Sequence, residues 1–384
     1  MIVTHIILKN WRNFRSVNVN LGNRVFLVGP NASGKSNFLD VFKFLHDIAK
    51  PGGGLQKAIS DRGGISKIRC LAARADPDVV IEVHLADTVG QKPLFKYAIG
   101  IKQQSRGRHL PYLGFEKVWN ETELISNRPD VQDKKDDLLL TQTHLEQINA
   151  NKKFREVERF FETISYSHLV PQLLRNPTAF RGSGVEGDPY GRNFLETVAK
   201  TPEKTRISRL RKIEAALKIA VPQLINLTEH RDEAGIPHLE ATYQHWRATG
   251  AKQREDQFSD GTLRLLGLLW ALLENDSLLL LEEPELSLNS AIVGRLPVLI
   301  YRLQTQKKRQ VILSTHSADL LTDTGIAGEE VLLLTPTSEG TTVEIASSIQ
   351  DIRFLMEGGM SVGDAVLPRT NPQDIDSIQS ELFK

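Results

Sequence analysis

Eight residues near the N-terminus combine glycines, a lysine and a serine in a spacing suited to holding phosphate groups. The segment reads Gly29, Pro30, Asn31, Ala32, Ser33, Gly34, Lys35, Ser36 and is followed by Asn37. It matches the pattern G-x-x-x-x-G-K-[ST], in which backbone N–H groups and a helix N-terminus surround the phosphates. We expect all nine residues to contact a nucleoside triphosphate, with Lys35 reaching the β- and γ-phosphates and the Ser36 hydroxyl binding magnesium.

An apolar run later in the chain ends in carboxylates. Residues 277–281 are followed by Glu282, Glu283, Pro284 and Glu285. At such a strand end, the first carboxylate joins the magnesium shell and the second orients or deprotonates the attacking water. We therefore assign Glu282 to the metal and Glu283 to the general base. Asp is usual at the first position, so the longer Glu282 predicts a looser or water-bridged geometry. A solvated acidic turn after a core strand is the alternative.

Two further segments have residue types suited to the γ-phosphate. Residues 258–264 open an apolar helix in which Ser259 or Thr262 would be the N-cap, and Gly261 leaves the backbone open to an anion. Residues 309–317 read as a strand that delivers His316 at its end. By itself each segment is more typical of a capped core helix or a structural histidine. The order of the four elements along the chain is far more specific.

The elements that must position these residues alternate between strand and helix. Residues 2–8 and 25–28 read as strands, and Phe38 to Ala49 has the apolar spacing of an amphipathic helix. Three short β-rich runs between residues 79 and 119 predict an antiparallel meander. Residues 258–336 alternate helix and strand again. The two ends of the chain therefore predict one α/β fold.

The polar composition in the middle of the chain predicts that this fold is interrupted. We expect an N-terminal half with the phosphate loop and the meander over residues 1–120, and a mainly helical insertion over 121–220. The C-terminal half, residues 221–384, would carry the Ser-x-Gly loop, the acidic strand and the histidine. Neither polar region has a sustained heptad repeat, so no long coiled coil is predicted.

The bulk composition favours a soluble globular protein and sets limits on its partners. The 384 residues are 40% hydrophobic and 25% charged, with a formal net charge of only +1. Nucleic-acid contact would therefore need a local patch, and residues 204–218 and 295–309 each hold a basic cluster, a pattern more typical of solvated helix faces. The single cysteine, Cys70, excludes an internal disulfide and a Cys-based zinc site.

The sequence gives no sign of export or membrane insertion. The first residues have no basic segment leading into an apolar one, and the apolar runs are too short to span a bilayer. A cytoplasmic location without a membrane partner is expected.

These motifs together resemble the ABC/SMC-like ATPases of the RecF type, including the compact bacterial AAA-type ATPases related to the ATPase part of the OLD (overcoming lysogenization defect) nucleases. The resemblance runs nearly end to end and is carried by the phosphate loop and by residues 9–16, 37–40, 261–266, 282–285 and 314–317. It implies an ABC-type ATPase head, in which a P-loop parallel sheet and an antiparallel β subdomain carry a helical insertion.

The resemblance also implies a composite site in a head-to-tail homodimer that binds ATP and Mg²⁺. Ser259 and Gly261 of one chain would contact the γ-phosphate held by Lys35 of the other. Arg15 would lie near the nucleotide, and His316 would sense the γ-phosphate beside Glu283.

Besides Glu282, which replaces the usual Asp, the sequence departs from relatives in one further segment. Residues 286–289 read Leu-Ser-Leu-Asn where relatives often have Leu-His-Pro, in a loop that normally meets its counterpart across the dimer. Gln56 is a weak candidate for the magnesium-coordinating glutamine that relatives place after the first helix.

Three functions fit these motifs. The first is an ATPase coupled to DNA, in repair or anti-phage defence. The second is an ATP-gated regulatory subunit that controls a separate effector such as a nuclease or toxin, without binding DNA itself. The segment after His316 shows no carboxylate set with metal-ligand spacing, so no nuclease activity of its own is expected. The third, a transporter ATPase, is disfavoured by residues 13–16, residues 259–262 and the helical insertion.

Overall fold

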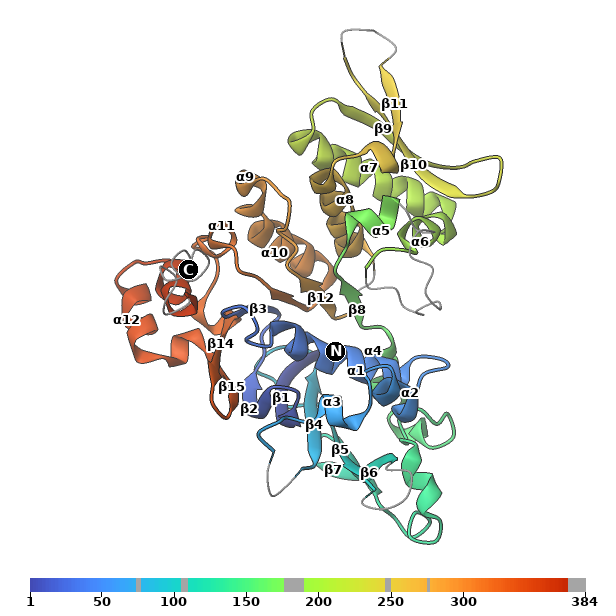
Figure 1. Ribbon diagram of the computed structural model, residues 1–384, viewed down its shortest axis with the longest axis vertical. Coiled ribbons are helices and arrows are strands. Elements are labelled where there is room, and N and C mark those ends of the chain that lie inside the picture. The colour runs from blue at the N-terminus through green and yellow to red at the C-terminus, as the bar shows by residue number, and fades with distance from the viewer. Residues whose placement is uncertain (74–76, 105–109, 176–189, 246–249, 275–276, 372–384) are drawn as a thin grey trace, which may run out of the picture.

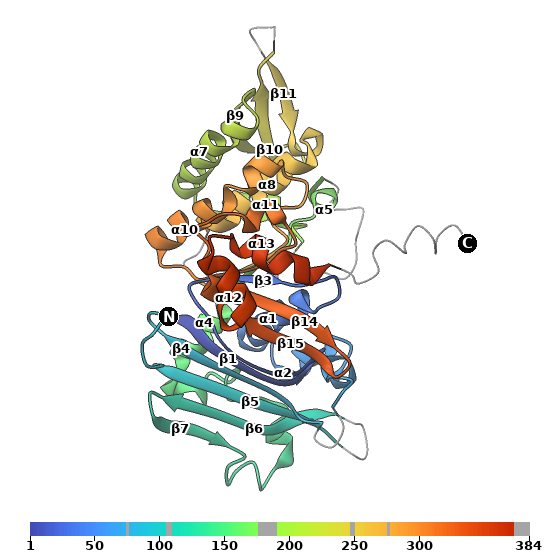
Figure 2. The ribbon, with the colours of Figure 1, turned by 90° about the vertical axis from the view of Figure 1, so that its left-hand side faces the viewer.

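The computed structural model describes residues 1–73, 77–104, 110–175, 190–245, 250–274 and 277–371. Their elements are stacked in three parts along the long axis of the molecule (Figures 1 and 2). An antiparallel sheet lies at one end, a mostly parallel sheet lies in the middle, and a helical lobe with a small sheet lies at the other end. The first two parts form what we call the head.

The antiparallel sheet of the head has the strand order β2-β1-β4-β5-β6-β7. Its strands are β1 (Ile2–Trp11), β2 (Phe14–Asn20), β4 (Val79–Ala86), β5 (Phe95–Gln103), β6 (Pro111–Asn120) and β7 (Glu123–Arg128). In β4, buried Val79, Ile81 and Val83 alternate with half-buried residues, which is the pattern of a sheet covered on one face. The predicted meander corresponds to β4, β5 and β6.

The parallel sheet has the strand order β15-β14-β3-β13-β12-β8, with β15 antiparallel at one edge. Its strands are β3 (Arg24–Val28), β8 (Ser165–Ser167), β12 (Leu279–Glu282), β13 (Val311–Ser314), β14 (Val331–Thr337) and β15 (Gly340–Ile345). All five residues of β3 are buried, because Val25 and Leu27 pack into one core while Phe26 and Val28 pack into another. Covering on both faces explains the continuous apolar runs of these strands.

Helices cover both faces of the parallel sheet. The core shared with the antiparallel sheet includes α1 (Lys35–Ala49), α2 (Leu55–Ser60), α3 (Ile65–Ile68) and α4 (Arg155–Glu162). The opposite core includes α9 (Ser290–Val293), α10 (Leu296–Lys307), α11 (Ala318–Leu321), α12 (Gln350–Glu357) and α13 (Val362–Val366). In the described part of the chain, no helix has the length and apolar character needed to cross a membrane.

The helical lobe has a third core of its own. It contains α5 (Pro171–Arg175), α6 (Phe194–Lys200), α7 (Glu203–Ala220), α8 (Asp260–Leu273) and the sheet of β9 (Leu224–Arg231), β10 (Pro237–Tyr243) and β11 (Ala251–Arg254). Helix α8 is buried along most of its length. Some of its residues pack into the core of the lobe, and others pack into the core that contains α10. This position fits its nearly uninterrupted apolar sequence.

The segment predicted as a mainly helical insertion contains strands that sequence reasoning did not identify. Residues 121–220 supply β7 to the antiparallel sheet and β8 to the edge of the parallel sheet, next to β12. Helix α4 of the same segment packs into the core around α1. Residues 176–189 of this segment lie outside the described residues. Its predicted boundaries stay a prediction, but its first part is built into the head.

Candidate active site

The phosphate loop lies between β3 and α1, as the sequence predicts, and an asparagine from the β1–β2 hairpin supports it. Gly34, the N-cap of α1, has φ +96°, and a Cβ there would lie 2.1 Å from Asn13 Nδ2. Asn13 Nδ2 donates a hydrogen bond to Ser33 O at 2.8 Å, and Asn37 Nδ2 donates to Asn13 Oδ1 at 2.8 Å. Sequence reasoning singled out the segment that contains Asn13 but gave this residue no role.

Lys35 extends back over its own loop. Its ammonium group donates to Gly29 O at 2.9 Å and to Pro30 O at 3.1 Å. Burial lowers the Lys35 pKa to about 8, although Glu283 and Glu282 raise it in part. The Ser33 hydroxyl is buried without a hydrogen-bond partner. An orphaned donor and a desolvated cation in a glycine-lined loop fit a phosphate group, which would pair with both.

The two residues predicted to hold magnesium are in contact. The Ser36 hydroxyl donates to Glu282 Oε1, and the Tyr166 hydroxyl donates to Glu282 Oε2. Ser36 follows β3 and Glu282 ends β12, and β13 is the strand that separates them in the sheet. Because the carboxyl ends of parallel strands share one sheet edge, residues far apart in sequence meet there. Their hard oxygen atoms suit Mg²⁺.

The predicted general base lies beside the predicted sensor. Glu283 Oε1 is 3.4 Å from His316 Nε2, and both side chains are about one-third exposed. Glu283 has φ +43°, and its N–H donates to Ser314 O at 3.1 Å, which aligns the turn with β13. Burial, and then the charge of Lys35, lower the His316 pKa, with Glu283 opposing them. At neutral pH the imidazole is therefore uncharged and can accept a proton or a hydrogen bond.

A third carboxylate of the acidic segment, Glu285, to which sequence reasoning gave no role, fixes the loop that carries His316. Glu285 Oε1 accepts hydrogen bonds from Thr315 Oγ1 at 2.6 Å and from the His316 N–H at 3.2 Å. Burial raises the Glu285 pKa, and its Oε2 is buried without a partner. The acidic turn and the histidine loop are thus joined into one unit. The acidic sequence Glu-Glu-Pro-Glu was the available signal.

The loop with the predicted trans contacts lies in the helical lobe. Ser259 is the N-cap of α8, where its hydroxyl accepts from the Thr262 N–H at 3.2 Å. A Cβ on Gly261 would lie 2.7 Å from Ser287 O, and Ser287 itself has φ +60°. Figure 1 shows α8 in the lobe and α1 in the head. The placement of Ser259 and Gly261 against another chain's nucleotide stays a prediction.

Two residues with predicted or candidate roles near the nucleotide make other contacts in the structure, and the placement of Arg15 near the nucleotide stays a prediction. Arg15 forms a 2.7 Å ion pair with Glu339, in the turn between β14 and β15, and both side chains are well exposed. The Gln56 amide donates to Pro111 O and Thr141 O, each at 2.9 Å, beside β6. Gln56 is therefore held in the β subdomain, and its candidacy as a magnesium ligand is wrong.

Part of the second basic cluster has a structural role. Lys307 Nζ donates to Leu273 O at 2.8 Å and to Glu274 O at 2.9 Å. Arg309 is buried, and its Nε donates to Ser277 O at 2.8 Å. These cations satisfy carbonyl groups at and beyond the C-terminal end of α8, where a helix leaves acceptors unpaired. The expectation of a solvent-facing cluster over residues 295–309 is wrong for Arg309.

Among curated proteins, the chain resembles Endonuclease GajA of Bacillus cereus (strain VD045). The two are 27% identical over 129 residues, which is 33% of this chain and 21% of GajA. The chain therefore matches only about one-fifth of the length of that relative. This similarity concerns a part of each protein.

Among solved structures, heads of SMC proteins share the fold. One, an SmcHead bound to the C-winged helix domain of ScpA, aligns with a TM-score of 0.54 at 14% identity, covering 90% of this chain and 98% of its own. A second, from Pyrococcus furiosus, aligns with a TM-score of 0.50 at 16% identity, covering 93% and 99%. The predicted ABC/SMC-like head fold is thereby confirmed.

The match to a family model covers most of the chain. The model is described as "AAA domain, putative AbiEii toxin, Type IV TA system", and it matches residues 24–323. That span begins at β3 and includes the phosphate loop, the acidic turn and His316. The chain therefore belongs to this family of AAA domains, with the fold of an ABC/SMC-like P-loop ATPase.

Proposed function

We propose that the protein binds ATP with Mg²⁺ and hydrolyses it to ADP and phosphate. The observation that carries this proposal is the convergence of Lys35, Ser36, Glu282, Glu283 and His316 at one edge of the parallel sheet. Three neighbouring strands, β3, β13 and β12, deliver these residues. A cation, a hydroxyl, two carboxylates and an uncharged imidazole are the groups that phosphoryl transfer to water requires.

Each residue has a separate role in this proposal. Lys35 exchanges the carbonyls of Gly29 and Pro30 for phosphate oxygens and stabilises the charge that develops on them. Ser36 and Glu282 hold the magnesium ion, which supplies charge neutralisation at the phosphates. Glu283 accepts the proton of the attacking water, and His316 hydrogen-bonds near the γ-phosphate.

We further propose that two chains complete two sites. Ser259 and Gly261 would approach the γ-phosphate bound by Lys35 of the other chain. The N-terminal end of α8 supports this role, because N–H groups of a 14-residue helix favour an anion there. Arg175 forms a 2.6 Å ion pair with Asp260 at that end, and its positive charge offsets the repulsion between Asp260 and a phosphate.

The proposed output is coupling of ATP turnover to DNA, in repair or anti-phage defence. The partial similarity to an endonuclease supports a role connected with nucleic acid. The second candidate is an ATP-gated subunit that controls a separate nuclease or toxin without touching DNA. The contacts of Lys307 and Arg309 favour this alternative. Both side chains donate to backbone carbonyls, so one of the two basic clusters has fewer cations to offer to DNA.

Steady-state ATP hydrolysis by the purified chain, with and without duplex and single-stranded DNA, tests both the ATPase activity and its coupling to DNA. Turnover above that of Lys35→Ala supports the ATPase, and stimulation by either DNA supports direct coupling. Basal turnover that ignores DNA supports the effector alternative. Absence of ATP binding by the wild-type protein would refute the proposed activity itself.

A further inference from the structure

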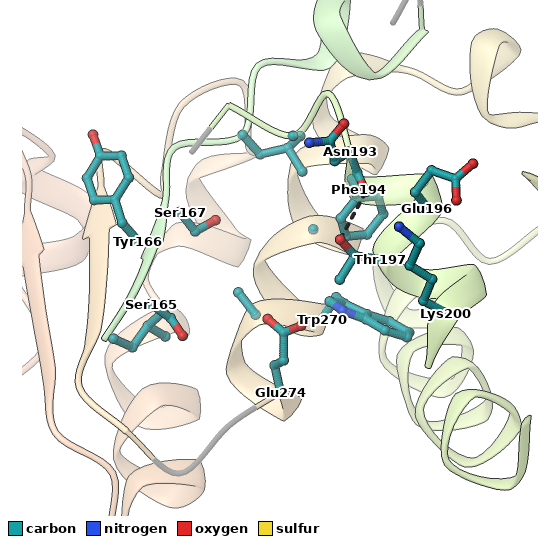
Figure 3. A pocket seen from close by; sticks show the side chains of 15 residues that line it. Ser165, Tyr166, Ser167, Asn193, Phe194, Glu196, Thr197, Lys200, Trp270 and Glu274 are labelled. Carbon is teal, nitrogen blue, oxygen red and sulfur yellow. Dashed lines mark hydrogen bonds between the residues drawn. The ribbon is translucent and has the colours of Figure 1, made fainter. Parts of the chain in front are cut away.

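Strand β8 connects the head to the helical lobe and carries a tyrosine that reaches the magnesium residues. It pairs in parallel with β12, with Tyr166 opposite Leu280. Figure 3 shows the ring of Tyr166 extending from β8 to the side opposite the side chain of Ser167, beside a cavity that all three residues of β8 line. That cavity has a volume of about 430 Å³. Tyr166 points to the side of the sheet where Glu282 lies, as its hydrogen bond requires.

The two oxygens of Glu282 have different partners. Oε1 accepts from Ser36, which follows the phosphate loop, and Oε2 accepts from Tyr166 on β8. His168 Nδ1 lies 3.2 Å from the backbone O of Glu282, so β8 and the residue after it contact both ends of this residue. The carboxylate is therefore held between a hydroxyl at the start of α1 and a hydroxyl on β8.

The surroundings of Tyr166 hold its ring in place. The ammonium group of Lys43, on α1, lies 3.9 Å from the centroid of the tyrosine ring, a cation–π contact. This contact keeps the ring beside Glu282, to which the tyrosine hydroxyl donates.

The length of Glu282 explains why such a donor matters. A glutamate has one methylene and one rotatable bond more than the aspartate usual at this position, so its carboxylate has more orientations to lose on binding a metal. A hydrogen bond to one oxygen removes much of that freedom while leaving the other oxygen directed at Ser36. Residues that orient a metal ligand in this way contribute strongly to metal affinity.

We propose that Tyr166 is a positioning residue that orients Glu282 for magnesium. This inference rests on the proposed role of Glu282 in the nucleotide–magnesium site. Tyr166 compensates for the longer acidic side chain, and it links the helical lobe to the metal through β8.

The direct test is the affinity of Tyr166→Phe for Mn²⁺ in the presence of an ATP analogue with a β,γ-imido bridge, measured by electron paramagnetic resonance. We expect metal affinity to fall about tenfold, while binding of the analogue without metal stays unchanged. Tyr97→Phe is the matched control, because Tyr97 is also buried and also donates to a carboxylate, Glu116, at 3.0 Å. It should leave metal affinity at the wild-type value.

A double-mutant cycle separates positioning from a general loss of stability. Glu282→Asp withdraws the carboxylate by one methylene, so adding Tyr166→Phe to it should change metal affinity little. If Tyr166→Phe binds Mn²⁺ as the wild type does, or if the two effects simply add, the inference is overturned. If the wild-type protein shows no metal-dependent binding of the analogue, the proposed magnesium site itself fails.

Discussion

Glu283 and His316 face each other across the ends of two neighbouring strands, with 3.4 Å between Oε1 and Nε2. Glu285 fixes the histidine loop beside Glu283 through Thr315 and the His316 N–H. The proposed base and its hydrogen-bonding partner are therefore preorganised, which lowers the cost of forming the reactive arrangement.

Replacing Glu283 with glutamine should leave ATP binding intact and slow turnover at least about tenfold, because the amide cannot accept the proton of water. Single-turnover hydrolysis and equilibrium ATP binding measure the two effects separately. Glu357→Gln, which changes an exposed carboxylate paired with Arg353, serves as the control. Turnover equal to the wild type in Glu283→Gln would remove Glu283 from the role of base.

Mixing two inactive variants should restore activity if the site is shared between chains. Lys35→Ala disables the phosphate loop and Ser259→Arg disables the α8 loop, so a mixed dimer keeps one intact site. Equal amounts that pair at random should recover about one-quarter of wild-type turnover. Each variant alone is the control. No recovery at any mixing ratio, with subunit exchange verified, would argue against a composite site.

Gly34→Ala should abolish nucleotide binding, because the added methyl group would meet Asn13 Nδ2 at 2.1 Å in a residue that already has φ +96°. Gly52→Ala is a matched control: it has φ +70° but no atom within 4 Å of its Cβ position. It should cost only about 1 kcal/mol of stability from the backbone conformation. Binding of a fluorescent ATP analogue measures nucleotide affinity in both variants, and thermal melting measures their stability. Equal ATP affinity in both variants would contradict the role given to Gly34.

Asp40→Asn should destabilise the protein at neutral pH and remove part of its acid sensitivity. Asp40 accepts from Arg12 at 2.7 Å and from Arg62 at 2.8 Å. Burial, the largest single influence, raises the Asp40 pKa, but the two arginines outweigh it and the pKa is lowered. A lowered folded-state pKa gives stability that is present above the unfolded value of about 3.9 and is lost as the pH falls through the folded value.

We expect Asp40→Asn to lose about 3 kcal/mol at pH 7 and to show a flatter decline below pH of about 4. Urea unfolding from pH 7 to pH 3 measures both. The exposed pair of Asp351 with Arg369, 3.0 Å apart, provides the control Asp351→Asn, which should change stability little. A parallel decline in wild type and Asp40→Asn would contradict the assignment.

Most parts of the site that were predicted from the sequence consist of residues that are adjacent in the chain. The phosphate loop follows from one uninterrupted segment between a strand and a helix, and the Ser259 cap follows from a serine before an apolar helix. The contact of Ser36 with Glu282 needed only the rule that parallel strands share one edge.

Tertiary contacts account for what sequence reasoning missed. Asn13 reaches Ser33 only because the β1–β2 hairpin lies against the phosphate loop, and Tyr166 reaches Glu282 because a three-residue strand joins the sheet. A strand that short has too few residues for a recognisable alternation. Arg309 looked like part of a surface cluster because charge alone does not reveal that carbonyl groups beyond α8 need a donor.

The close approach of Gly261 to Ser287 would have a kinetic consequence in the proposed dimer. The chain segment after the acidic turn of one site rests against the loop that would serve the other site, with no space for a side chain between them. Any displacement of that turn during one turnover would be transmitted to the opposite nucleotide. In such a dimer, the rate of ATP hydrolysis would then rise with ATP concentration with a Hill coefficient above one.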